Sequence, residues 1–153
     1  TVAPLAELLL FAADRAQHVE FLIRPSIAAG RVVISDRYAD ATAAYQGAGR
    51  GFAAETIQQV ISLATGGLKP DLTIFFDISV EEAFGRMADR DEAGGKRNRM
   101  DSEKAEFYQR VRDEYLAIAR REPERFIVID AARSIADIHH DVTQTVTGLL
   151  ENN

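Results

Sequence analysis

The chain has 153 residues, of which 46% are hydrophobic and 27% charged, the balance of an ordinary soluble globular domain. Its net charge of −6 argues against binding nucleic acid along a broad basic face, because such a face needs clustered lysine and arginine. The lack of cysteine excludes disulfides and thiolate metal sites, and no apolar run reaches the roughly 18 residues of a membrane span. We therefore expect a soluble cytoplasmic protein without a nucleic-acid or membrane partner.

The first predicted element is a long helix. A proline suits its first turn, and apolar residues recur at helical spacing through residues 5–23, until Arg24 and Pro25 interrupt the pattern. A short helical piece then ends at Gly30. The stretch RVVIS, residues 31–35, has no polar alternation, which is typical of a strand covered on both faces in a parallel sheet.

The rest of the chain alternates helical and strand patterns. Helices are predicted over residues 53–65 with a stop at Gly66 and Gly67, from a capping box at Ser79 to about residue 90, over 102–121, and after a cap at Ser134. Strands are predicted over residues 72–78, again buried on both faces, and over 126–130. Residues 91–101 have no periodicity and two adjacent glycines, so we predict a mobile loop. Helices alternate with strands of the parallel type, which indicates an α/β fold in one domain, residues 1–153.

Asp36 and Arg37 directly follow the predicted strand at residues 31–35. In open parallel sheets, ligands bind beyond the carboxyl ends of the strands. At such an end, Asp36 can hold a hydrated Mg²⁺, and Arg37 can bind a phosphate with two parallel hydrogen bonds. The alternative is that Asp36 caps the following helix and Arg37 pairs with it or with another acid. The residues by themselves favour neither interpretation.

Phe11 and Arg15 lie four residues apart on the first predicted helix and therefore share a face. An aromatic ring beside a guanidinium can stack on a planar base and hydrogen-bond its edge. An aromatic residue in an apolar helical stripe is more often part of the core. Taken alone, the pair favours the core interpretation.

Cations gather around the predicted loop in an otherwise acidic chain: Arg86, Arg90, Lys96, Arg97 and Arg99. Phosphoryl transfer depends on cations around the migrating group, so a flexible basic lid suits that chemistry. A solvated loop is the commoner meaning of such a run. Tyr45 and Gln46, ahead of the stretch GAGRG, can supply an aromatic wall and an amide, but a glycine cluster outside a strand-to-helix turn is a weak signal.

The segments LLLFAADRAQHV, VVISDRYADATAAYQGAGRG, KPDLTIFFDIS, NRMDSE and IVIDAARSI stand in the order and spacing of bacterial thymidylate kinases. The resemblance covers essentially the whole chain. It implies a three-layer parallel sheet of the P-loop nucleoside-monophosphate kinase type. It also implies a dTMP kinase that uses ATP and Mg²⁺ to make dTDP in dTTP biosynthesis, with residues 91–101 as the lid.

The resemblance also implies roles for residues on the acceptor side. Phe11 would stack on thymine, Arg15 would hydrogen-bond the edge of the base, and Arg37 would bind the acceptor phosphate. Asp36 would serve the Mg²⁺ and the acceptor. The residues that would line the thymidine pocket are Thr42, Tyr45 and Gln46, with the tyrosine excluding a ribose 2′-hydroxyl.

On the donor side, the resemblance places Arg86 against adenine and the turn at Asp130, Ala131 and Ala132 near the ATP base. The lid would contribute further cations: Arg90, Arg97 and Arg99. The implied catalytic residues are therefore Asp36, Arg37 and these lid arginines.

The phosphate-binding loop of the family, G-x-x-x-x-G-K-[ST], does not occur in the 153 residues. Its backbone N–H groups and lysine cradle the donor phosphates, so we expect the chain alone to be inactive. The family's first strand would lie between residues 31–35 and 72–78, so we expect its first two strands to be missing and the sheet to keep an open gap. The relatives look like homodimers, and we expect the same here. The alternatives are a deoxynucleoside kinase of the same superfamily and a nucleotide-binding or dimerising fragment without turnover.

Overall fold

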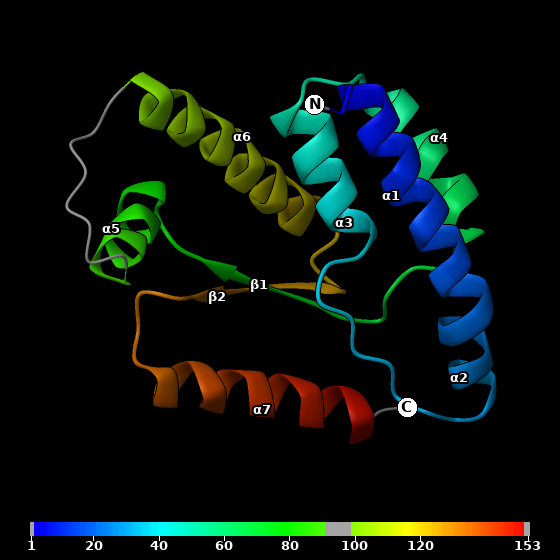
Figure 1. Cartoon of the computed structure of the whole chain (residues 1–153). Helices are drawn as coiled ribbons and strands as arrows, with labels where there is room; N and C mark the ends of the chain where they lie inside the picture. Colours follow the sequence, from blue (N-terminus) through cyan, green and yellow to red (C-terminus); the bar gives the residue numbers. More distant parts are fainter. Residues whose placement is uncertain (1, 91–98, 152–153) are drawn as a thin grey trace. The chain divides into compact units, whose positions relative to one another are not determined.

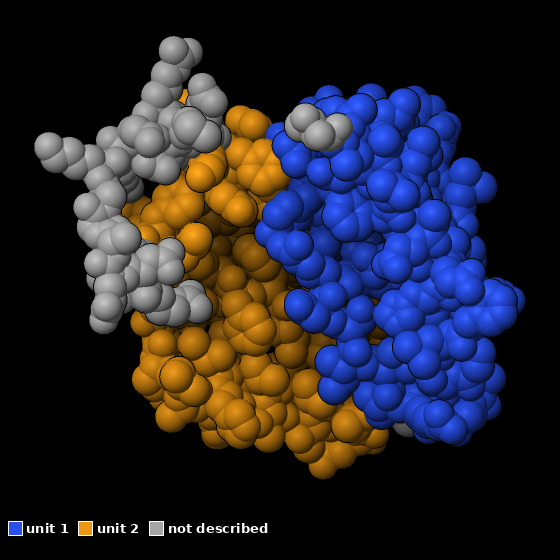
Figure 2. Space-filling view, in the orientation of Figure 1, with its two compact units in different colours: residues 1–69 blue, residues 70–153 orange. Residues whose placement is uncertain are grey.

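The structure, a computed structural model, describes the backbone of residues 2–90 and 99–151 and the side chains of residues 2–87 and 104–151. The chain forms two compact units, residues 1–69 and 70–153, drawn in blue and orange in Figure 2. The single domain expected over residues 1–153 stays a prediction. None of the helices in the described parts of the chain combines the length and apolar character needed to cross a membrane.

Helix α1 (Pro4–His18) has a proline in its first turn, as predicted, and leads through a π-helical segment, Val19–Ile23, into α2 (Arg24–Ala28). The helical path therefore continues past the predicted interruption. In a regular helix, the ring of Pro25 would clash with the carbonyl four residues before it. The wider π-helical turn directly upstream accommodates the ring. Gly30, with a φ of 71°, then closes this helical piece as predicted.

Residues 31–35 form no strand in the part of the chain that the structure describes, so the prediction of a strand there was wrong. Val32 and Ile34 are 66% and 93% exposed instead of buried. A strand is held by hydrogen bonds between its backbone and a neighbouring strand. Among its described residues, unit 1 contains no other strand. The apolar pattern alone therefore does not make this segment a strand.

The second half of unit 1 is helical. Helix α3 (Ala39–Thr42) continues as a π-helical segment (Ala43–Gly49), a stretch for which no element was predicted, and α4 (Ala54–Thr65) matches a predicted helix. Both α1 and α3 pack against α4 (Figure 1). The buried apolar residues of this unit include Leu8, Val19, Ile23, Ala44 and Ile57. Helix α4 ends at Gly66, whose left-handed φ of 55° confirms the predicted stop.

Unit 2 contains the other predicted elements, at close to their predicted bounds: β1 (Thr73–Asp77), α5 (Val80–Arg90), α6 (Arg99–Arg121), β2 (Phe126–Asp130) and α7 (Ile135–Glu151). The predicted caps are confirmed as well. The backbone N–H of Glu82 donates to the Ser79 hydroxyl at 3.2 Å, and that of Asp137 donates to the Ser134 hydroxyl at 3.2 Å.

Strands β1 and β2 pair in parallel, with Asp77 opposite Asp130 at their carboxyl ends. Figure 1 shows α6 on one side of the pair and α7 on the other, so this unit has the three layers of an α/β fold. The burial predicted for both faces of residues 72–78 was wrong, because Phe76 is 49% exposed. A sheet of two strands leaves part of each face without cover. The further strands that the resemblance implies stay a prediction.

Candidate functional site

The turn at Arg37 has an unusual backbone. Its φ of 67° is left-handed, and among the described residues it is the one non-glycine residue with positive φ. A long side chain rarely adopts this conformation, which costs free energy unless neighbouring groups hold it. Here two donors reach the Arg37 carbonyl: the Ser35 hydroxyl at 3.0 Å and Nη1 of Arg15 at 3.1 Å. These hydrogen bonds hold the turn in place.

The Arg37 side chain points to Tyr45. Its Nη2 donates a hydrogen bond of 2.6 Å to the Tyr45 hydroxyl, and its guanidinium carbon lies 4.4 Å from the centre of the Tyr45 ring. The structure therefore brings together Arg37 and Tyr45, which the resemblance assigns to the same substrate, dTMP. Helix α3 begins without a side-chain cap, so the interpretation of Asp36 as its cap was wrong.

Arg15 extends from α1 to the same turn. Besides its bond to Arg37, its Nη2 donates to the Tyr38 carbonyl at 3.3 Å, and its guanidinium carbon lies 4.7 Å from the centre of the Tyr38 ring. Its Nε is buried and has no hydrogen-bond partner. Burial lowers the pKa of Arg15, and the nearby Tyr38 and Asp14 oppose that effect. An arginine nevertheless stays protonated at physiological pH.

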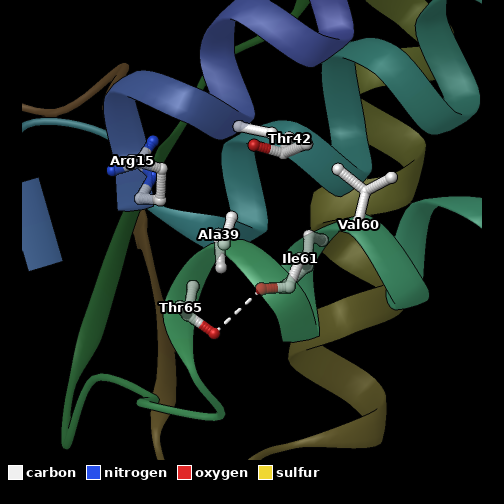
Figure 3. A pocket seen from close by; sticks show the side chains of 8 residues that line it. Arg15, Ala39, Thr42, Val60, Ile61 and Thr65 are labelled. Atoms are coloured by element: carbon white, nitrogen blue, oxygen red, sulfur yellow. Dashed lines mark hydrogen bonds between the residues drawn. The ribbon is translucent and has the colours of Figure 1, made fainter. Parts of the chain in front are cut away.

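A small cavity lies beside Arg15 in unit 1 (Figure 3). It is lined by Ala12 and Arg15 of α1, Ala39 and Thr42 of α3, and Val60, Ile61, Ala64 and Thr65 of α4. Its volume of about 10 Å³ suits a single water and is too small for a pyrimidine. The Thr65 hydroxyl donates to the Ile61 carbonyl at 2.9 Å, the dashed line in Figure 3, and is therefore satisfied within its own helix.

The remaining residues assigned to the thymidine pocket differ in exposure. Phe11 is 50% exposed, so the core interpretation of this residue was wrong. Gln46 is buried, at 6% exposure. Neither residue lines the small cavity, whereas Thr42 does. A base that stacks on Phe11 would therefore lie outside this small cavity.

In unit 2, polar contacts hold the carboxyl ends of the two strands. The backbone N–H of Ala131 donates to the Asp77 carbonyl at 2.8 Å, and that of Ala132 donates to Oδ1 of Asp130 at 2.8 Å. The Asp77 carboxylate accepts two hydrogen bonds from Arg112 of α6, at 2.6 and 2.8 Å. These bonds raise the pKa of Arg112. The turn assigned to the ATP base is thus attached to β1.

The sequence analysis did not identify Arg112, one of several arginines on a charged helix. The available signal was Asp77, an acid at the end of an apolar strand, which needs a cationic or donor partner when it is partly buried. Its partner lies 35 residues away, so sequence spacing does not identify it.

Of the cations assigned to the donor side, the structure describes the side chain of Arg86. Arg86 is exposed on α5 and pairs with Glu82 one turn earlier, at 3.0 Å. Arg97 lies outside the described residues, as do the side chains of Arg90 and Arg99. Residues 99–101, predicted as the end of the loop, are helical and open α6.

A magnesium site needs oxygen ligands, and Mg²⁺ typically takes one or two carboxylates together with phosphates and water. Asp36 offers an exposed carboxylate next to Arg37. The described residues include no group of three or more His, Asp or Glu side chains placed to hold a metal by themselves. Asp36 therefore fits a Mg²⁺ that is held mainly by the phosphates of a ligand.

Comparison with known proteins identifies the family. The family model described as thymidylate kinase matches residues 1–142. The chain belongs to the thymidylate kinase family. It is 49% identical over 140 residues to the thymidylate kinase of Desulfosudis oleivorans, covering 90% of this chain and 65% of that protein. It is 45% identical over 151 residues to the thymidylate kinase of Geotalea uraniireducens, covering 97% of this chain and 71% of that protein.

A solved structure gives the same family. The chain is similar to the crystal structure of thymidylate kinase from Ehrlichia chaffeensis, with a TM-score of 0.74 and 32% identity over 95% of this chain and 66% of that one. The α/β kinase fold expected from the resemblance is therefore confirmed at that level. The chain spans 65% of the length of the first of these relatives.

Proposed function

We propose that this chain is the carboxyl-side part of a dTMP kinase, whose intact form transfers the γ-phosphoryl group of ATP to dTMP and gives dTDP for dTTP biosynthesis. Besides family membership, one observation carries this proposal. Arg15, Arg37 and Tyr45 meet at one strained turn, although they come from separate helical segments and a loop. Strained backbone that neighbouring groups hold in place is typical of ligand sites.

In this proposal Arg37 binds the acceptor phosphate. The Tyr45 hydroxyl and ring hold one side of its exposed guanidinium. The planar guanidinium has five N–H donors, so others remain for two phosphate oxygens. Asp36, exposed and next in sequence, serves the Mg²⁺ and the acceptor. Mg²⁺, when bound, neutralises charge on the phosphates.

The thymidine part of the acceptor would contact the same unit. Phe11 exposes half of its surface and can stack on the base. Arg15 hydrogen-bonds the edge of the base, with Thr42 beside it. The ring of Tyr45 would exclude a ribose 2′-hydroxyl, and Gln46, which is buried, would contribute to the thymidine pocket.

On the donor side, we propose that Arg86 lies against adenine and that the turn at Ala131 and Ala132 contacts the ATP base. The lid arginines would stabilise the charge on the migrating phosphoryl group: Arg90, Arg97 and Arg99. Catalysis would then depend on positioning and on cations more than on covalent chemistry by the protein.

The donor phosphates need a phosphate-binding loop, which the 153 residues do not contain. We propose that residues outside this chain supply the loop and the first two strands of the sheet. The exposed Val32 and Ile34 support this, because a strand placed beside residues 31–35 would pair with their backbone and cover them.

We further propose a homodimer in the cytoplasm. Several apolar side chains are exposed on α1, among them Leu5 at 55%, Leu9 at 53% and Leu10 at 63%. An apolar helical surface of this kind is typical of a protein interface.

The proposed activity is tested with the full-length protein, by following phosphorylation of dTMP and of thymidine with ATP and Mg²⁺. Turnover of dTMP is expected; turnover of thymidine without dTMP would indicate a deoxynucleoside kinase instead. Calorimetry of the 153-residue chain with dTMP is the companion measurement, and binding without turnover is expected. Turnover by the pure 153-residue chain would contradict the proposed need for the missing loop.

A further inference from the structure

Tyr38 is a half-buried residue to which neither the resemblance nor the proposed mechanism assigns a role. Its hydroxyl donates to the Leu68 carbonyl at 3.2 Å, so the end of the ring is attached to the segment after α4, within the same unit. Its carbonyl and its ring both contact Arg15. Burial raises the pKa of the Tyr38 hydroxyl, which stays neutral and acts as a donor.

The position of Arg15 depends on these contacts. Its two terminal nitrogens each donate one hydrogen bond to the turn, at 3.1 and 3.3 Å, and the Tyr38 ring supports its flat face. Its Nε is buried without a partner, although an arginine that could reorient freely would satisfy this group. The orientation of the guanidinium is thus set by the turn and the ring. Each terminal nitrogen keeps a second N–H for a ligand.

We propose that Tyr38 is a positioning residue for base selection, acting through Arg15. This inference rests on the proposed function and concerns the same acceptor site. A guanidinium offers only donors, so it accepts a pyrimidine with a carbonyl at the 4-position and rejects one with an amino group there. The preference for thymine over cytosine then depends on holding Arg15 in place. Tyr38 provides that support with its anchored ring.

The test compares Tyr38→Leu and Tyr38→Phe in the full-length protein. Tyr38→Leu removes both the ring and the hydroxyl, whereas Tyr38→Phe keeps the ring over Arg15 and loses only the bond to Leu68. The measurements are kcat/KM for dTMP and for dCMP, and KM for ATP. A matched control is Ile57→Val, which weakens the core of the same unit at a residue that is 1% exposed and does not line the cavity beside Arg15.

For Tyr38→Leu, we expect the ratio of kcat/KM for dTMP to that for dCMP to fall roughly 3- to 30-fold, the range of a cation–π contact, with an unchanged KM for ATP. Tyr38→Phe should lower this ratio less than Tyr38→Leu does. Ile57→Val should leave the ratio unchanged, however much thermal stability it loses. A ratio that Tyr38→Leu leaves intact, or that Ile57→Val lowers equally, would overturn the inference. An unmodified protein that does not phosphorylate dTMP would instead overturn the proposed function.

Discussion

The two units build their candidate sites in different ways. In unit 1, the candidate acceptor residues meet through hydrogen bonds from side chains to the main chain and between side chains, around a left-handed residue and next to π-helical segments. In unit 2, the candidate donor turn follows a regular pair of parallel strands, and the backbone register places it. The candidate acceptor site therefore depends on a few side chains. The candidate donor turn depends on the hydrogen bonds between β1 and β2 and on one ion pair, between Arg112 and Asp77. Substitutions should separate the two.

Arg37→Ala is expected to have the largest effect on activity. It removes the cation from the proposed phosphate site and should weaken dTMP use by roughly 1.5–3 kcal/mol or more, the strength of hydrogen bonds to charged groups. Stability should change little, since the side chain is exposed. The measurement is kcat/KM for dTMP beside KM for ATP. Arg31→Ala, at an exposed arginine six positions earlier, is the control; normal dTMP use by Arg37→Ala would refute the assignment.

Phe11→Ala should come next. Base–aromatic stacking is worth roughly 1–3 kcal/mol, so dTMP affinity should fall by that amount. Because half of the side chain is exposed, the loss of stability should be smaller than for a core phenylalanine. Calorimetry with dTMP and thermal unfolding separate the two effects. Phe21→Ala, at a residue 71% exposed farther along the same helical path, should leave dTMP affinity unchanged; an equal loss in both variants would mean that Phe11 does not contact the base.

Arg112→Met tests the other unit. It breaks the two hydrogen bonds to Asp77, which is only 19% exposed, and should lower the free energy of unfolding by roughly 1–2 kcal/mol. Because Asp77 also carries the bond to Ala131, KM for ATP should rise while KM for dTMP stays the same.

Arg121→Met is the matched control for Arg112→Met. It breaks a more exposed pair with Glu114 on the same helix and should cost less than about 1 kcal/mol. If Arg112→Met raised KM for dTMP and left KM for ATP unchanged, the donor and acceptor sites would not be separate.

Gly66→Ala should have a smaller effect than Arg112→Met, on stability alone. The left-handed φ of 55° strains any side chain, and an added Cβ would lie 2.8 Å from Nη2 of Arg24, so we expect a loss of roughly 1 kcal/mol. Gly67→Ala has similar strain at φ 75° but no atom within 4 Å, so the difference between them isolates the Arg24 contact.

Replacing a glycine inside a regular helix by alanine should instead stabilise the protein. Gly85 lies inside α5, and among the described residues no atom beyond its own stretch of helix lies within 4 Å of an added Cβ. Gly85→Ala should therefore raise the free energy of unfolding by roughly 0.5–1 kcal/mol. Thermal unfolding of the three glycine variants tests both expectations, and a destabilised Gly85→Ala would show that the helix there is constrained by more than its own backbone.

The sequence by itself determined the longer helices and the two strands of unit 2. Helical periodicity located α1, α4, α5, α6 and α7, and unbroken apolar runs located β1 and β2. Gly66 and the capping serines at positions 79 and 134 marked ends that the structure confirms. These features are local: a cap, a stop or a helical face is encoded within a few residues, so the chain path elsewhere does not alter it.

Only the tertiary structure decided the rest. The run at residues 31–35 reads as a strand, but a strand needs a partner, and none is described beside it. Arg15 reaches the carbonyl of Arg37 across 22 residues, and Arg112 reaches Asp77 across 35. Contacts of that separation depend on how the helices pack, which local patterns do not encode. The sequence therefore identified the candidate residues individually. Only the structure shows which of them lie together and that Tyr38 supports Arg15.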